Sequence, residues 1–191
     1  MLVQSGQQKP GAAKWGRESL TAVHGASYTG KLKALRLLLD NCGDVNAVDS
    51  YRRTALHLCS QTGVLDDARS KDVAEILISY DADPSKEVDS FHYTALRFAV
   101  EALKPELCRF LALHGADPDV CAENGSTALQ QCVVINETNV GLNIAQILLK
   151  DGKAKINQST GPGFTALGVA VNKNRPEMVS LLLDHNADPH I

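Results

Sequence analysis

The sequence predicts an all-α repeat solenoid, in which pairs of helices stack side by side. A segment that begins with Thr and continues as an apolar stretch recurs five times, with its Thr at positions 21, 54, 94, 127 and 165. A second apolar stretch follows each copy, and a turn signal closes the unit. Two of the Thr spacings are 33 residues and the others are 40 and 38. A period of this length is typical of stacked repeats.

The first helix of each unit begins at this Thr. The five copies read TAVHGASYTG, TALHLCSQTG, TALRFAVEAL, TALQQCVVIN and TALGVAVNKN. A Thr at a helix start caps the backbone and contributes about 1 kcal/mol. Two positions later comes a residue that should face the core: Val23, Leu56, Leu96, Leu129 or Leu167. Three positions further on, the side chain is always small, which predicts a close approach of neighbouring helices: Ala26, Cys59, Ala99, Cys132 or Ala170.

The second helices are predicted over the stretches that follow, 35–40, 74–79, 107–112, 145–150 and 179–184. Each stretch, with its flanks, is long enough for two or three helical turns. The units then close with turn-forming residues at 43–46, 82–84, 115–118, 155–157 and 187–189. Each unit is therefore helix, short turn, helix, and a longer extended turn.

The repeated unit resembles the ankyrin repeat, whose signature is Thr-Pro-Leu-His-x-Ala with a Gly-Ala-Asp-Val-Asn turn. Ala replaces the signature Pro in all five copies, at 22, 55, 95, 128 and 166. The resemblance implies a curved stack of antiparallel helix pairs, with a hairpin finger projecting from each junction. It covers residues 17–191, after a flexible leader over 1–16, in units of about 17–49, 50–89, 90–122, 123–160 and 161–191. Trp15 either folds back over the first unit or is disordered.

His24 and His57 occupy the signature His position, which the family uses to hydrogen-bond neighbouring turns. Arg97, Gln130 and Gly168 stand there in the later units. From this replacement we expect looser contacts between fingers in the C-terminal half.

Two insertions lengthen units 2 and 4, over 63–72 and within 135–143. We expect polar, solvated loops that project from the same edge of the stack. Asp66, Asp67 and Asp72 do not have the spacing of a calcium loop, so no metal site is predicted there. The last unit keeps an apolar outer face (178, 179 and 181–183), whereas a terminal repeat is normally polar outside. We therefore expect the domain to continue or to have been cut at its C-terminus.

Composition narrows the classes of function. Lys plus Arg number 19 and Asp plus Glu number 22, a net charge of −3, which does not favour nucleic acid as a partner. No apolar run is long enough to cross a bilayer, and the N-terminus does not read as a signal peptide. Five cysteines without a Cys-x-x-Cys spacing indicate reduced thiols, no zinc site and a cytoplasmic or nuclear location. No cofactor is predicted, and we expect a monomer.

The resemblance implies protein recognition on the concave surface, which the finger tips and first helices form. Carrying the family's contact positions onto this chain gives a predicted partner-binding set: Tyr51, Arg53, Leu58, Phe91, Tyr93, Phe98, Glu101, Val134, Ile135, Phe164 and Val169. Five of the nine aromatic residues fall in this set. Exposed aromatics commonly anchor interfaces, so we expect a partner with apolar groups centred on Phe91, Tyr93 and Phe98. The alternative is that these rings pack finger against finger.

Three classes of function remain at this point. The first class is a free-standing adaptor or inhibitor. The second class is a regulatory or targeting domain of a larger enzyme, channel or ubiquitin-ligase subunit. The third class is a cysteine-dependent enzyme, suggested by Thr54, His57, Cys59 and Ser60. The repeat argues against this class, because the same positions recur as structural residues in every unit. Asn46 and Asn157 occupy the turn position where the family can be hydroxylated, and the sequence does not say whether either is modified.

Overall fold

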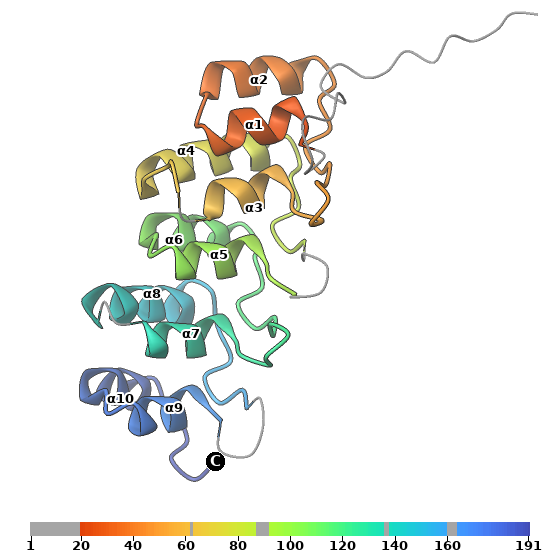
Figure 1. Ribbon diagram of the computed structural model, residues 1–191. Coiled ribbons are helices and arrows are strands. Elements are labelled where there is room, and N and C mark those ends of the chain that lie inside the picture. The colour runs from red at the N-terminus through yellow and green to blue at the C-terminus, as the bar shows by residue number, and fades with distance from the viewer. Residues whose placement is uncertain (1–19, 62, 87–91, 136–137, 160–163) are drawn as a thin grey trace, which may run out of the picture.

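The structure is a single stack of five antiparallel helix pairs (Figure 1). It is a computed structural model and describes residues 20–61, 63–86, 92–135, 138–159 and 164–191. The first helices are α1 (Ala22–Tyr28), α3 (Ala55–Ser60), α5 (Ala95–Glu101), α7 (Ala128–Val134) and α9 (Ala166–Asn172). The second helices are α2 (Leu32–Asp40), α4 (Asp67–Ser79), α6 (Pro105–Leu113), α8 (Thr138–Lys150) and α10 (Pro176–Asp184). The predicted all-α solenoid is therefore confirmed, while the predicted leader at 1–16 lies outside the described residues.

The helix starts follow the repeated Thr. Each of the five first helices is preceded by its Thr in an extended conformation. The hydroxyl accepts a backbone hydrogen bond three residues on, at 3.2 Å for Thr94, 3.3 Å for Thr127 and 3.1 Å for Thr165. These bonds satisfy amide groups that the helix itself leaves unpaired. The predicted caps are confirmed.

One continuous core runs through the stack. The predicted core residues of the first helices are buried, with Leu56 1%, Leu96 0% and Leu129 2% exposed. The small residues are buried as well, from Ala26 at 7% to Ala170 at 0%. Since a unit has only two short helices, it buries its apolar side by packing on its neighbours. In the described ranges, no helix has the length and apolar content needed to cross a membrane.

Hydrogen bonds from the signature position join each unit to the next finger. The Nε2 atom of His24 donates to the Arg53 carbonyl at 3.1 Å, and that of His57 donates to the Lys86 carbonyl at 2.9 Å. On each ring, Nδ1 accepts the backbone N–H of the capping Thr at 3.1 Å. Both nitrogens of each imidazole are therefore used, and the neutral ring with its proton on Nε2 fits both bonds.

The later units keep this connection, so the expectation of looser C-terminal fingers is wrong for units 3 and 4. Gln130 copies the histidine, because its Oε1 accepts from Thr127 N at 2.8 Å and its Nε2 donates to the Phe164 carbonyl. Arg97 reaches the next finger with Nη1, which donates to the Ser126 carbonyl at 3.1 Å. Any long side chain with an N–H donor at this position can make the bond. Gly168 has no side chain with which to make it.

The insertions lengthen helices, and the prediction of polar loops is wrong for most of their length. Helices α4 and α8 have 13 residues each, whereas α2, α6 and α10 have nine. Asp66 caps α4 by accepting from Arg69 N at 2.8 Å. An acidic cap followed by an amphipathic continuation extends a helix, although its polar composition resembles that of a loop.

The extended α4 is bonded to the third unit. The Asp67 carboxylate accepts from Glu106 N at 2.8 Å and Leu107 N at 2.9 Å, so it caps the neighbouring helix α6. Beside it, Lys104 is 4% exposed and its ammonium donates to the Cys59 carbonyl at 3.2 Å, the Gln61 carbonyl at 2.6 Å and Ser70 Oγ at 2.9 Å. All three donors of the buried ammonium have partners.

The extended turns are bonded to one another as well. The Asn46 amide donates to the Asp81 carbonyl at 2.9 Å and accepts from Asp83 N at 3.0 Å. Asn157 accepts from Asp188 N at 2.9 Å. The two asparagines therefore have a structural role in joining successive turns.

The His57 bond makes folding sensitive to acid. Burial lowers the pKa of His57 from 6.5 to about 4. Between pH 6.5 and about pH 4, His57 is protonated in the unfolded chain and neutral in the folded chain. The free energy of unfolding therefore falls as the pH drops through this window, by about 3 kcal/mol from this group. We expect His57→Gln, which copies the bonds of Gln130, to retain stability at neutral pH and to flatten this part of the pH dependence. Urea unfolding of both chains from pH 7 to pH 4 measures the effect.

His57→Ala is the matched control, because it removes the bonds together with the titration. It should lower stability at neutral pH by about 3 kcal/mol. Equal acid sensitivity in the native chain and His57→Gln would contradict the assignment of the titration to this ring.

Asp67→Ala should destabilise the fold by about 1 kcal/mol, because it removes the cap of the neighbouring helix α6. Asp72→Ala is the control, since Asp72 lies on the same helix with its side chain 52% exposed, 3.6 Å from Arg69. Chemical unfolding of the two variants should separate them by that amount. If both variants lost the same stability, the effect would come from the removal of a negative charge and not from the loss of the cap.

Candidate functional site

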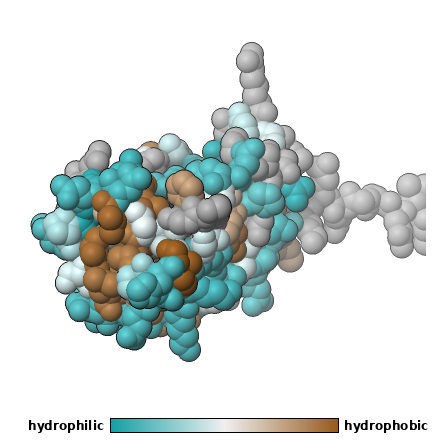
Figure 2. All heavy atoms as spheres, turned by 90° about the horizontal axis from the view of Figure 1, so that it is seen from below, coloured by the Kyte–Doolittle hydropathy of each residue, from teal (hydrophilic) through white to brown (hydrophobic). Residues whose placement is uncertain are grey.

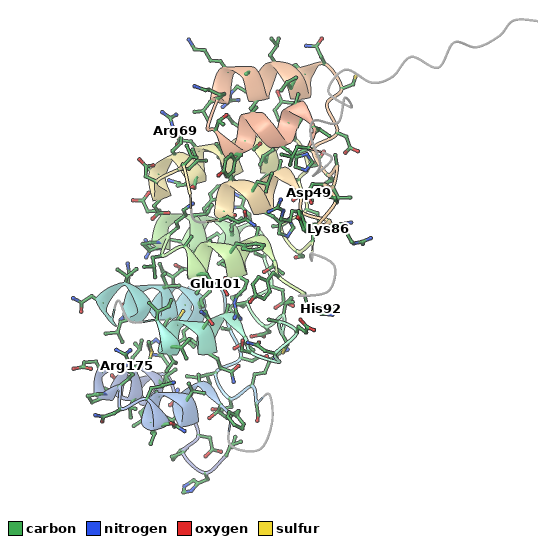
Figure 3. All side chains as sticks on the ribbon, viewed as in Figure 1. Asp49, Arg69, Lys86, His92, Glu101 and Arg175 are labelled. Carbon is green, nitrogen blue, oxygen red and sulfur yellow. The ribbon has the colours of Figure 1, made fainter. Side chains whose placement is uncertain are left out.

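The described members of the predicted partner-binding set differ in exposure. Figure 3 shows Asp49, Lys86 and His92 on the finger side of the stack and Arg69 and Arg175 on the opposite side. Tyr51 and Phe164 are each 58% exposed and Val134 is 40% exposed. A second group is half-buried: Arg53, Tyr93, Phe98, Glu101, Ile135 and Val169.

One member of the set is not exposed as the prediction requires, and another lies outside the described residues. Leu58 is 6% exposed and belongs to the core, so its expected exposure is wrong. The reason is that α3 lies between two neighbouring first helices, and all six of its residues are buried. Phe91, the third ring of the predicted centre, lies outside the described residues.

The central rings pack within the stack. The ring centroids of Tyr93 and Phe98 are 5.4 Å apart in an edge-on arrangement, and those of Phe98 and His57 are 5.9 Å apart. Edge-on contacts at these distances are favourable in their own right. Tyr93 and Phe98 therefore form a fixed wall instead of free anchors, and the contact joins a finger residue to a helix residue, not finger to finger as the alternative had it.

Arg97 organises the polar part of the surface, a role that the sequence interpretation missed. Its side chain is largely buried and lies 5.2 Å from the centre of the Tyr93 ring. Its Nε donates to Glu101 at 3.1 Å, and its Nη2 donates to Gln131 Oε1 at 3.0 Å and Ser126 Oγ at 3.1 Å. The spacing of Arg97 and Glu101, four residues apart on one helix, was the sequence signal that could have found this pair.

A second cation–ring pair supports the first exposed finger. The Arg53 guanidinium lies 4.8 Å from the centre of the Tyr51 ring and 2.7 Å from the Asp49 carboxylate. Asp49 also accepts the backbone N–H groups of Tyr51 and Arg53, at 2.9 Å and 2.8 Å. Tyr51 is thus an exposed ring on a finger whose backbone is fixed.

A shallow hollow lies at the C-terminal ends of α3 and α5, lined by Gln61, Phe98, Glu101 and Ala102. One wall is the Phe98 ring and another is the Glu101 carboxylate, which already pairs with Arg97. The hollow therefore offers both apolar and polar contact to a side chain of another molecule. Its open shape does not resemble the deep, enclosed pocket that binds a small molecule.

The residues that suggested a cysteine nucleophile do not form one. Burial raises the pKa of the Cys59 and Cys132 thiols to about 12 and that of Cys108 well above its usual value. A thiol in this state is a poor nucleophile. His57 cannot act as its base, because both ring nitrogens bond to backbone groups. Asp66 and Asp67 serve as helix caps and Asp72 pairs with Arg69, so these carboxylates have structural contacts of their own.

Comparison with known proteins gives the same architecture. The family model for ankyrin repeats, which contains three copies, matches residues 2–88, 26–120 and 96–191. An ankyrin repeat protein of fowlpox virus (strain NVSL) is 32% identical over 117 residues, which are 61% of this chain and 26% of that protein. The nuclear factor NF-kappa-B p105 subunit of Gallus gallus is 26% identical over 175 residues, 90% of this chain and 17% of that protein.

A plant relative completes the comparison. A BTB/POZ domain and ankyrin repeat-containing protein of Oryza sativa subsp. japonica is 36% identical over 97 residues, 50% of this chain and 18% of that protein. The chain spans less than half the length of each of these three relatives.

Thiol labelling of the folded chain should separate exposed from buried cysteines. Cys42 is exposed, so a soluble disulfide reagent at about pH 8 should modify it first. Cys59, Cys108 and Cys132 should react only after unfolding, because they are buried and mostly protonated at that pH. Mass spectrometry of the modified peptides measures the order. Cys42→Ser should abolish the fast phase, and rapid labelling of Cys59 in the folded chain would revive the cysteine-enzyme hypothesis.

Proposed function

Because the chain belongs to the ankyrin repeat family, we propose that it binds a partner protein or peptide on the concave surface of finger tips and first helices. Ankyrin repeats are generally modules of protein–protein interaction, which supports the class of function. The proposal adds the face and the chemistry: an apolar group of the partner contacts the exposed rings, and no catalysis takes place.

The observation that carries the proposal is the exposure of three apolar side chains of the predicted partner-binding set. Tyr51, Val134 and Phe164 belong to three different units and are each at least 40% exposed. An exposed apolar side chain gains free energy when a partner covers it, by about 25 cal/mol for each Å² buried. Tyr93, Phe98 and the Arg97 network lie between Tyr51 and Val134 along the chain and hold the surface in one shape. A rigid surface loses little conformational entropy on binding.

The exposure of these three side chains modifies the expectation from sequence. The predicted centre was Phe91, Tyr93 and Phe98, of which the last two pack against each other. In the proposal they are supports, while the exposed residues of units 2, 4 and 5 are the anchors. A partner long enough to reach all three would be an extended segment or the face of a folded domain. A cytoplasmic or nuclear location fits a surface of this kind together with five free cysteines.

A second candidate function is that of a regulatory or targeting domain within a larger protein. The lengths of the relatives favour it, since the matching region is 17% of the p105 subunit and 18% of the rice protein. The rice protein, as its name says, contains a BTB/POZ domain as well as ankyrin repeats. The complete open reading frame distinguishes this arrangement from a free-standing adaptor, and the concave surface binds a partner in both cases.

Replacing the three exposed anchors together tests the proposal. Tyr51→Ala, Val134→Ala and Phe164→Ala in one chain should lower partner capture at least tenfold and change the midpoint of thermal unfolding little, since exposed side chains contribute little to stability. The chain serves as bait in lysate of its native cells, and quantitative mass spectrometry compares the captured proteins. A partner found in this way is then measured with purified components.

Leu113→Ala is the matched control, because Leu113 is 62% exposed at the end of the second helix α6. It should capture the same proteins as the native chain. Equal capture by the triple variant and the native chain would refute the concave surface as the binding site. Phe98→Ala should lower the unfolding midpoint, in accordance with its supporting role.

A further inference from the structure

The hollow at the C-terminal ends of α3 and α5 combines an aromatic ring with hydrogen-bonding side chains. Gln61 and Ala102 directly follow the two helices, and Phe98 and Glu101 lie on the last turn of α5. All four residues are half-buried, and Phe98 and Glu101 belong to the predicted partner-binding set. The α9–α10 end has a different character, because Figure 2 shows an area of hydrophobic side chains there. The polar groups of the hollow therefore indicate which side chain of a partner fits it.

The Glu101 carboxylate has one bonded oxygen and one open oxygen. Its Oε1 accepts from Arg97 Nε at 3.1 Å. Its Oε2 has no hydrogen-bond partner among the residues that the structure describes, and the side chain is 31% exposed. The negative charge is particular to this place in the stack. Seven residues after the capping Thr, the other units have an uncharged side chain: Tyr28, Gln61, Val134 or Asn172.

Two cations lie beside the hollow, and their donors are already used. Each of the five N–H groups of Arg97 has an acceptor, because Nε donates to Glu101 and the two Nη atoms donate to four acceptors of unit 4. The three donors of Lys104 go to two carbonyls and one hydroxyl of unit 2. An anionic group in the hollow would therefore meet the Glu101 carboxylate and receive no hydrogen bond from either cation. The hollow favours a cation.

A guanidinium group satisfies the groups that line the hollow. It is planar and stays charged at neutral pH, and it has several N–H donors in one plane. One edge can donate to Glu101 Oε2, and its flat face can lie against the Phe98 ring. The side-chain amide of Gln61, which has no partner in the described part of the chain, offers its oxygen as a second acceptor. A lysine ammonium could pair with Glu101, but it has no flat face for the ring.

We propose that this hollow binds an arginine side chain of the partner, an inference that rests on the proposed function. The surrounding contacts hold the hollow in shape, because Lys104 fixes the Gln61 carbonyl at 2.6 Å and Phe98 packs edge-on against Tyr93. A preformed site loses little conformational entropy on binding. The partner therefore presents a basic residue together with its apolar groups, and the arginine supplies specificity through charge.

A titration with N-acetyl-L-arginine amide, followed by nuclear magnetic resonance, tests the hollow without knowledge of the partner. The signals of Gln61, Phe98, Glu101 and Ala102 should shift and saturate, with a dissociation constant on the order of 1 mM for so small a probe. N-acetyl-L-citrulline amide has nearly the same shape and no charge, so it should leave these signals in place. Ionic strength is kept constant, because salt screens exposed charges.

Three variants identify the groups that bind the probe. Glu101→Gln keeps an acceptor for Arg97 and removes the charge, so it should weaken binding at least about fivefold. Gln61→Glu adds a second carboxylate and should strengthen binding about fivefold, a gain that loss of folding cannot produce. Glu75→Gln is the matched control, because it removes one carboxylate from the exposed side of α4 and should bind as the native chain does. Thermal unfolding of each variant confirms that it is folded.

The inference is overturned if arginine amide causes no saturable shift at these residues, or if citrulline amide causes the same one. Equal affinity in Glu101→Gln and the native chain would overturn it too, and equal affinity for N-acetyl-L-lysine amide would overturn the choice of arginine. The triple variant of Tyr51, Val134 and Phe164 changes no residue of the hollow, so it should still bind arginine amide. Partner capture by that variant tests the proposed function separately, so either proposal can fail while the other measurement stands.

Discussion

The hydrogen bond from the third residue of α1, α3, α5 and α7 to the carbonyl of the next finger sets the register of the stack. Hydrophobic burial brings the units together, but it is non-directional and would permit neighbouring helices to slide. The donor at this position bonds a carbonyl at a fixed place in the next finger, as His57 bonds the carbonyl of Lys86. With the small residues at the positions of Cys59 and Ala99, it fixes both the spacing and the alignment of adjacent units. The rest of the surface inherits its geometry from these contacts.

The same contacts explain why the proposed binding surface is stiff. Phe98 packs on the His57 ring. The His57 ring therefore takes part in both the inter-unit hydrogen bond and the central aromatic wall. Lys104 and Asp67 add polar contacts between units 2 and 3, on the side of the second helices. A partner at the proposed surface would therefore meet side chains that these contacts already hold in place. In repeat proteins, the scaffold positions commonly contribute stability and the surface positions contribute specificity.

The sequence predicted the fold because its signals are local and repeated. The Thr caps, the core leucines and the small residues each recur with a fixed spacing, and five copies make the pattern hard to mistake. Three features escaped prediction for physical reasons. Arg97 and Gln130 were expected to loosen the finger contacts because they replace histidine. The bond requires only an N–H donor of sufficient reach, which both side chains have. The Asp-rich insertion resembled a loop, and its first two aspartates, Asp66 and Asp67, are helix caps. Exposure of Leu58 depends on how closely neighbouring units approach, which one unit's sequence does not reveal.

The side chains at the signature position differ along the stack, so its two ends respond differently to acid. Its first two junctions depend on imidazoles, and burial lowers the pKa of both His24 and His57. The next two depend on a guanidinium and an amide, neither of which changes its charge between neutral and mildly acidic pH. Acid therefore acts on one end of a quasi-one-dimensional array, in which each unit contacts only its neighbours. As the pH falls below 6.5, the loss of stability is therefore largest at the junctions that follow α1 and α3, and it has a direction along the stack.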